Sequence, residues 1–291
     1  MTSFSFNILY ILESLNEDEI KTGKNLYDEL CSNLVRPTPP LVIYKSISSG
    51  REWDECINEI YHDCIQKGVK PIIHLEMHGD DTGIGFINGD TRDHRTLCTQ
   101  FSGINFACGC NMLLTLGVCE GLNILKGMQV TIPMPYCVAL GSFEELWNVD
   151  IELRFTEFYK ELFSSYDLNK AYAKLLQANS KYTEKYRPYP IDELFYIAYN
   201  GYLQKQCNKE AVKERAKSTV GNSDLHYNNR RERRGYEKGF IKDEKRTRLA
   251  EYKRIARDFF ATEKYPNNFS RFNIPSTFDE LKKRYQSIIK K

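Results

Sequence analysis

The sequence predicts an α/β fold in which a mostly parallel sheet is flanked by helices. Two observations support this class. Apolar runs of strand length alternate with amphipathic segments of helical length through most of the first two thirds of the chain, and the longest connections between strands have room for a helix. Such alternation is typical of parallel sheets covered on both faces. The expected strands are residues 6–12, 41–47, 71–78, 112–119 and 136–140.

The expected helices follow from apolar periodicity and from glycine and proline at the ends of the segments. A helix over 51–67 should end at Gly68, and the proline-rich run 36–40 should form a turn. A second proline-rich run at 186–190 suggests a boundary between a domain of residues 1–185 and a basic helical C-terminal region of residues 186–291. The other expected helices are 17–34, 92–107, 146–163, 168–177, 191–205, 231–262 and 278–289, with a polar linker at 218–229.

Two apolar runs end on a reactive side chain that is followed closely by glycine. The first ends in His78-Gly79 and the second in Cys119-Glu120-Gly121. A cysteine is a nucleophile only as its thiolate, and a nearby histidine can take its proton and later return it. Cys119 is therefore the candidate nucleophile and His78 the candidate acid–base group.

The segment between these runs predicts that the two side chains meet. Residues 79–91 are rich in Gly and Asp and are expected to form a surface loop, and residues 92–107 can form a helix. A strand, loop, helix and strand in this order make a right-handed crossover between parallel strands. Parallel strands end on the same edge, so His78 and Cys119 should share the carboxyl edge of the sheet, where open α/β sheets place their sites.

With these residues the sequence resembles the caspase-like cysteine peptidases, a group that includes caspases, metacaspases, gingipains and separases, and is closest to bacterial CHAT domains. The shared features are His78-Gly79, Cys119-Glu120-Gly121 and the 41 positions between the histidine and the cysteine. A third similarity is the apolar run at 136–142 ending in Gly-Ser, followed by Trp147-Asn148-Val149-Asp150 and an amphipathic segment. The resemblance covers roughly residues 5–180.

The resemblance implies a cysteine endopeptidase that works through a Cys–His dyad and a thioacyl-enzyme intermediate, with no cofactor, no metal and no required third residue. The backbone N–H groups of Gly79 and Cys119 would form the oxyanion hole. The resemblance also suggests that the protein acts in a bacterial defence system. The sequence departs from the pattern at Gly117, where several relatives carry an acidic residue or Gln in the substrate pocket. Glu120, Glu144, Glu145 and Asp150 are the remaining pocket candidates, although Asp150 could equally cap a helix.

Each of these residues also has a structural interpretation. Cysteine is among the most buried residue types, so a lone cysteine at a strand end usually packs in the core. His74 lies four residues before His78 on the same face of the strand and is expected to be a buried, hydrogen-bonded histidine, whereas His62 and His94 are expected at the surface. A metal site at His94, Cys98, Cys108 and Cys110 is disfavoured, because Cys108-Gly109-Cys110 lacks the usual ligand spacing.

Composition limits the other classes of function. No run approaches the roughly 20 apolar residues that span a bilayer, and residues 1–7 do not resemble a secretion signal. The nine cysteines are irregularly spaced, which predicts free thiols in a reducing cytoplasm. A protein substrate is the expected partner, and a regulatory protein is a second.

The net charge of +2 conceals an asymmetry between the two parts of the chain. Residues 201–291 hold 24 Lys and Arg against 12 Asp and Glu, for +12, and the remaining 17 and 27 give residues 1–200 a charge of −10. The favoured interpretation is a solvated helical surface that docks on the acidic part. The alternatives are a nucleic-acid-linked effector that uses its basic part, with the cluster 230–234 at its centre, and an inactive caspase-like module that binds a partner.

Overall fold

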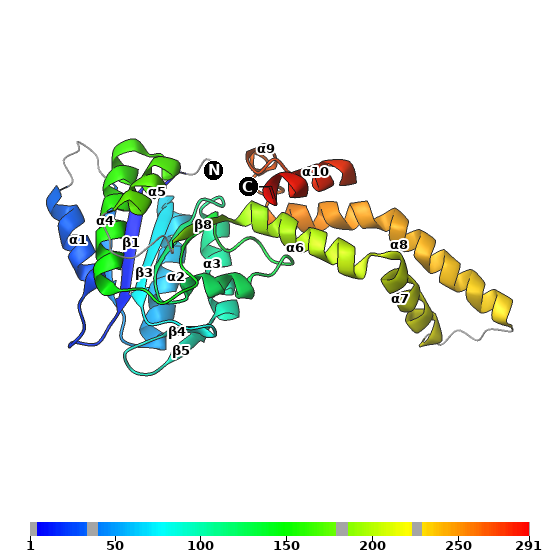
Figure 1. Cartoon of the computed structure of the whole chain (residues 1–291), viewed down its shortest axis with the longest axis horizontal. Helices are drawn as coiled ribbons and strands as arrows, with labels where there is room; N and C mark the ends of the chain where they lie inside the picture. Colours follow the sequence, from blue (N-terminus) through cyan, green and yellow to red (C-terminus); the bar gives the residue numbers. More distant parts are fainter. Residues whose placement is uncertain (1–4, 34–39, 179–185, 223–228, 291) are drawn as a thin grey trace.

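The computed structural model describes residues 5–33, 40–178, 186–222 and 229–290 and confirms the predicted α/β class (Figure 1). Its main sheet has six strands in the order β2-β1-β3-β6-β7-β8, and all neighbours are parallel except the β7–β8 pair. The expected turn at 36–40 lies almost entirely outside the described residues. The strands are β1 (Ile8–Ser14), β2 (Leu41–Ser46), β3 (Pro71–Met77), β6 (Leu113–Gly117), β7 (Val138–Gly141) and β8 (Arg187–Pro190).

Helices cover both faces of the sheet, as Figure 1 shows. The layer on the side of α1 (Thr22–Asn33) also contains α4 (Asn148–Ser165) and α5 (Leu168–Gln177), and the opposite layer contains α2 (Gly50–Lys67) and α3 (His94–Ala107). The strands between them are buried on both faces, which explains why most residues of β3 and β6 are apolar. The largest side chains of the core include Trp53, Phe101, Phe155, Phe158 and Tyr159.

Local chemistry sets the ends of α2 as the sequence predicts. The Ser49 side chain accepts a hydrogen bond from the N–H of Glu52, and the chain leaves the helix at Gly68 with a φ of 66°. Glycine adopts this left-handed conformation without steric cost, so it ends the helix and directs the chain into β3.

The segment expected to be a loop at 79–91 contains a small hairpin. Strands β4 (Gly83–Gly85) and β5 (Thr91–Asp93) pair antiparallel, and Gly79 forms an isolated bridge to Ile84. A β-carbon on Gly83 would come within 2.1 Å of the Arg92 carbonyl oxygen, so glycine permits this close approach. The prediction of a loop was wrong for this part of the segment, because its glycines allow two strands to pack closely in a hairpin and do not mark a turn.

The C-terminal region begins within the sheet and continues as a helical arm. The proline-rich run that suggested a boundary forms the edge strand β8, where proline is tolerated. Helix α6 (Ile191–Gln206) follows at once, and α8 (Arg230–Phe259) runs beside it back toward the body (Figure 1). The helix α7 (Lys209–Gly221) was not predicted, and it includes the first residues of the expected linker at 218–229, of which 223–228 lie outside the described residues.

Aromatic packing joins the helices of this arm to one another. Phe195 of α6 stacks on Phe259 with ring centroids 4.8 Å apart and meets Phe260 at 5.0 Å. The short helix α9 (Asn268–Arg271) and α10 (Phe278–Ile288) follow, and Arg284 pairs with the buried Asp192 at 2.7 Å. None of the helices described here is long and apolar enough to cross a membrane.

Candidate functional site

The two predicted catalytic residues follow neighbouring parallel strands. Strands β3 and β6 are directly hydrogen-bonded, and their last paired residues are Glu76 and Gly117. His78 and Cys119 each lie two residues further on, so they occupy corresponding positions just beyond the paired strands. Neighbouring paired strands are about 4.8 Å apart. In the described residues, the hydrogen bonds of the two side chains are with other residues, Glu19 for His78 and Leu146 for Cys119. The structure thus brings His78 and Cys119 to the same edge of the sheet.

Gly79 permits the close approach of the two strand ends. A β-carbon at this position would lie 2.4 Å from Val118 Cγ1 and 3.0 Å from the carbonyl oxygen of Cys119. Any other residue would therefore push the two ends apart. The backbone of Gly79 and that of Cys119, whose N–H groups are the candidates for an oxyanion hole, consequently lie side by side.

The loop after β7 positions the sulfur of Cys119. The backbone N–H of Leu146 donates a hydrogen bond to Sγ over 3.3 Å, and an N–H donor of this kind stabilises a negatively charged sulfur. The loop is itself attached to the cysteine segment, because Glu120 N–H donates to the Glu144 carbonyl at 3.0 Å and Leu122 N–H to that of Ser142 at 2.9 Å. Glu120 has a φ of 54°, which marks a sharp turn directly after the cysteine.

The surroundings of Cys119 differ from those of most other cysteines. Six of the others are buried, and burial raises the pKa of Cys56 to about 11 and that of Cys98 to about 12. Such thiols stay protonated and unreactive at neutral pH. Cys119 is partly exposed at a strand end, and only Cys31 and Cys207 share access to solvent.

Glu19 contacts the candidate histidine and was not found by the sequence analysis. Its Oε1 lies 2.8 Å from His78 Nε2, and its Oε2 accepts hydrogen bonds from the backbone and side-chain nitrogens of Asn16 at 2.6 and 2.9 Å. Partial burial alone would raise the pKa of Glu19, but the Asn16 hydrogen bonds and the charge of His78 lower it overall. A carboxylate only accepts, so Nε2 carries a proton in this contact.

A row of buried polar side chains lies within the paired strands β3 and β6, before His78 and Cys119 in each strand run. His74 is fully buried, as predicted, with Nδ1 2.8 Å from Thr115 Oγ1 and Nε2 2.8 Å from Glu76 Oε1. The other Glu76 oxygen accepts from Thr22 at 2.9 Å. Burial raises the pKa of Glu76, while the bond to His74 acts in the opposite direction. Helix α4 closes the row through Tyr159, whose hydroxyl is 2.5 Å from that of Thr115.

The Glu76 carboxylate occupies the space above Gly117. A β-carbon on Gly117 would come within 2.6 Å of it, which accounts for a glycine at this position. The four acidic candidates in the predicted pocket differ in placement, and Glu145 is exposed. Glu144 is exposed, Glu120 accepts a hydrogen bond from Asn123 at 3.0 Å, and Asp150 is buried and paired with Arg154 at 2.7 Å. Asp150 is in the first turn of α4 but does not cap it, since Trp147 occupies that position.

His94 does not lie at the surface, contrary to expectation. It begins α3 and is buried because the chain around Gly127 packs onto its backbone, where a β-carbon on Gly127 would lie 2.1 Å from the His94 carbonyl oxygen. Burial lowers the pKa of its imidazole. Among the described residues, no group of three or more His, Cys, Asp or Glu side chains has the geometry of a metal site.

Comparison with models of known protein families and with curated proteins finds no match for this sequence.

Proposed function

We propose that the protein is a cysteine endopeptidase in which Cys119 is the nucleophile and His78 the general acid and base. The observation that carries the proposal is the placement of His78 and Cys119 at corresponding positions beyond the hydrogen-bonded parallel strands β3 and β6. The hydrogen bond from Leu146 N–H to Sγ and the glycine between the strand ends support it.

The reaction proceeds in two steps with Cys119 as the carrier of the acyl group. His78 takes the thiol proton, and Sγ attacks the peptide carbonyl carbon to form a carbon–sulfur bond. The carbon–nitrogen bond then breaks as His78 delivers the proton to the departing amine. A water molecule gives a proton to His78 and attacks the thioacyl carbon, which releases the acid and restores the thiol.

Two further groups assist these steps. The N–H groups of Gly79 and Cys119 stabilise the negative oxygen of each tetrahedral intermediate, and removing one such donor typically costs about 2.7–4 kcal/mol. Glu19 is a positioning residue, because it holds His78 with Nε2 protonated and leaves Nδ1 to accept the proton from the thiol.

The experiment that tests this function combines labelling and turnover. An electrophilic peptide probe should label the wild-type chain at Cys119, as mapped by mass spectrometry, and should leave a Cys119→Ala variant unlabelled. A set of peptide substrates should be cut by the wild type alone. Cleavage that survives in Cys119→Ala would contradict the role of Cys119. The absence of both labelling and cleavage with the wild type would contradict the peptidase function and favour an inactive module that binds a partner.

A further inference from the structure

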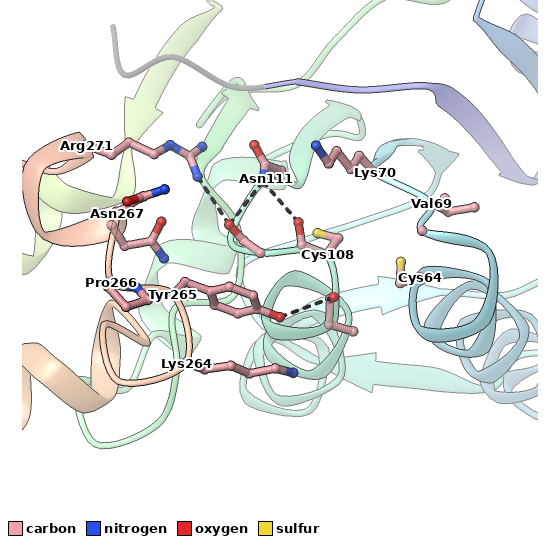
Figure 2. A pocket seen from close by; sticks show the side chains of 14 residues that line it. Cys64, Val69, Lys70, Cys108, Asn111, Lys264, Tyr265, Pro266, Asn267 and Arg271 are labelled. Carbon is pink, nitrogen blue, oxygen red and sulfur yellow. Dashed lines mark hydrogen bonds between the residues drawn. The ribbon is translucent and has the colours of Figure 1, made fainter.

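A cavity of about 560 Å³ lies at the edge of the sheet opposite to His78 and Cys119. Lys70, which precedes β3, and Asn111, which precedes β6, line it from the body, and the segment 264–268 with Arg271 lines it from the C-terminal region (Figure 2). Its volume is within the range of small-molecule sites, which is roughly 300–1,000 Å³. The cavity therefore joins two parts of the chain that are distant in sequence.

The charge of its lining has one sign. Lys70, Lys264 and Arg271 contribute to the cavity wall, and none of the lining residues is Asp or Glu. Lys70 Nζ donates to the Ser5 hydroxyl at 3.0 Å, and Lys264 Nζ lies 4.4 Å from the centroid of the Phe106 ring. Among the described residues, neither lysine has a carboxylate partner. By contrast, most of the ion-paired side chains of α8 have a carboxylate partner within that helix.

The backbone oxygens near the cavity are already hydrogen-bonded within the protein. The carbonyl of Gly109 accepts from Asn111 Nδ2 at 3.0 Å and from Arg271 at 3.2 Å, and the Cys108 carbonyl accepts from Asn111 at 3.0 Å. Tyr265 donates its hydroxyl proton to the Phe106 carbonyl at 2.8 Å. These donors offset the negative end of α3 on this side of the cavity.

We propose that this cavity binds a small phosphorylated molecule. Lysine ammonium groups bind phosphate as point charges, and the Asn267 side chain, which Figure 2 shows beside Arg271, adds a neutral amide. Tyr265 and Val69 provide apolar surface for the remainder of the ligand. Because the lysines come from the body and from the C-terminal region, the bound ligand fastens residues 264–271 to the sheet. The proposal does not depend on the peptidase function.

Calorimetric titration of the full chain tests this site with three phosphorylated probes: inorganic phosphate, ribose 5-phosphate and adenosine monophosphate. At least one should bind, and adenosine should not. Lys70→Met and Lys264→Met keep the aliphatic stems while removing the charges, and each should weaken binding at least about tenfold. Lys238→Met removes a charge from α8 outside the cavity and should leave affinity unchanged.

The comparison among the probes shows whether phosphate alone, a sugar phosphate or a nucleotide fits the cavity best. Binding of any of the three supports the site if it depends on both lysines. Hydrogen exchange of residues 264–271 should slow with the tightest probe bound. The proposal is overturned if none of the three binds at millimolar concentration, if adenosine binds as tightly as its monophosphate, or if the double variant Lys70→Met/Lys264→Met binds as the wild type does.

Discussion

His74 and His78 lie on the same strand run and the same face, four residues apart, but the structure places them in opposite surroundings. His74 is fully buried, and both of its ring nitrogens are bonded within the protein. The side chain of His78 is 63% exposed, and its one hydrogen bond in the described residues goes to Glu19. The same residue type thus stabilises the sheet at one position and is accessible to a substrate at the other.

This difference extends to the neighbouring strands. In the inner row, His74 links β3 to β6 through Thr115 and is bonded to Glu76 on its own strand. Each of these buried hydrogen bonds is costly to break, because an unpaired buried group has lost its solvation. The edge row of His78 and Cys119 lies beyond the strand pairing, where side chains can reach a ligand. The proposed reaction of the edge row therefore depends on the rigid packing of the inner row. The following variants separate the two rows.

The largest effect is expected at the nucleophile. Replacing Cys119 by Ala should lower peptidase activity roughly 10⁶-fold, as the loss of the nucleophile does in a serine protease, because no thiolate remains to form the acyl-enzyme. Thermal unfolding should be nearly unchanged, since Cys119 is only partly buried. The matched control is Cys207→Ala, a cysteine of similar exposure, which should keep full activity.

The two histidines should give opposite results when each is replaced by Ala. His78→Ala should reduce turnover by roughly 10²–10⁴-fold through loss of the acid and base, with little change in the unfolding free energy. His74→Ala should cost about 3 kcal/mol of stability, since it leaves Glu76 buried without its partner. Denaturant unfolding and turnover are measured on both, and an exchange of the two outcomes would mean that the roles are reversed.

The sequence predicted the fold where local signals were strong. Gly68 ended α2 as expected, and the apolar runs before His78 and Cys119 identified β3 and β6, because strands buried on both faces are continuously apolar. The hairpin β4–β5 and the edge strand β8 were missed, since their glycines and prolines indicate turns unless the neighbouring strand is known. Their structure depends on pairing, which a local pattern does not encode.

The candidate site also contains some residues that the sequence identified and others that it did not. His78, Gly79 and Cys119 could be identified from motif and topology, and the position of His74 within the apolar run distinguished it from His78 at the end of that run. Glu19 carried no such signal: it lies in a polar turn 59 positions before His78, and only the packing of that turn brings the two together. The role of Gly117 was equally hidden, because the carboxylate above it comes from the adjacent strand.

Gly117 lies at the junction of the two rows, so a single methyl group there tests how closely they are packed. Gly117→Ala should destabilise the fold by about 1–3 kcal/mol through overpacking, because its β-carbon would meet the Glu76 carboxylate at 2.6 Å. The matched control is Gly85→Ala in β4, where a β-carbon meets nothing within 4 Å. If both variants had the same free energy of unfolding in denaturant, the Glu76 side chain would be able to move away from the new β-carbon without loss of stability.

The smallest effect is expected at Glu19, which belongs to neither row but holds the edge histidine. Glu19→Gln should lower kcat by up to about fivefold, because an exposed ion pair contributes about 1 kcal/mol at most, and it should leave KM unchanged. The nitrogen chemical shifts of the His78 ring should move toward a mixture of tautomers, a change that a merely structural residue would not cause. Glu17→Gln, in the same turn and exposed, is the control.

The pH adds a further check on Glu19. Since the pKa of Glu19 is lowered, its carboxylate stays charged below the range usual for glutamate, and the contact with His78 is lost only as the pH falls through that lowered value. The Glu19 carboxylate of the wild type should therefore be available to His78 throughout the neutral range. If Glu19→Gln kept the wild-type tautomer and the wild-type kcat, Glu19 would have no positioning role, and the strand end alone would orient the histidine.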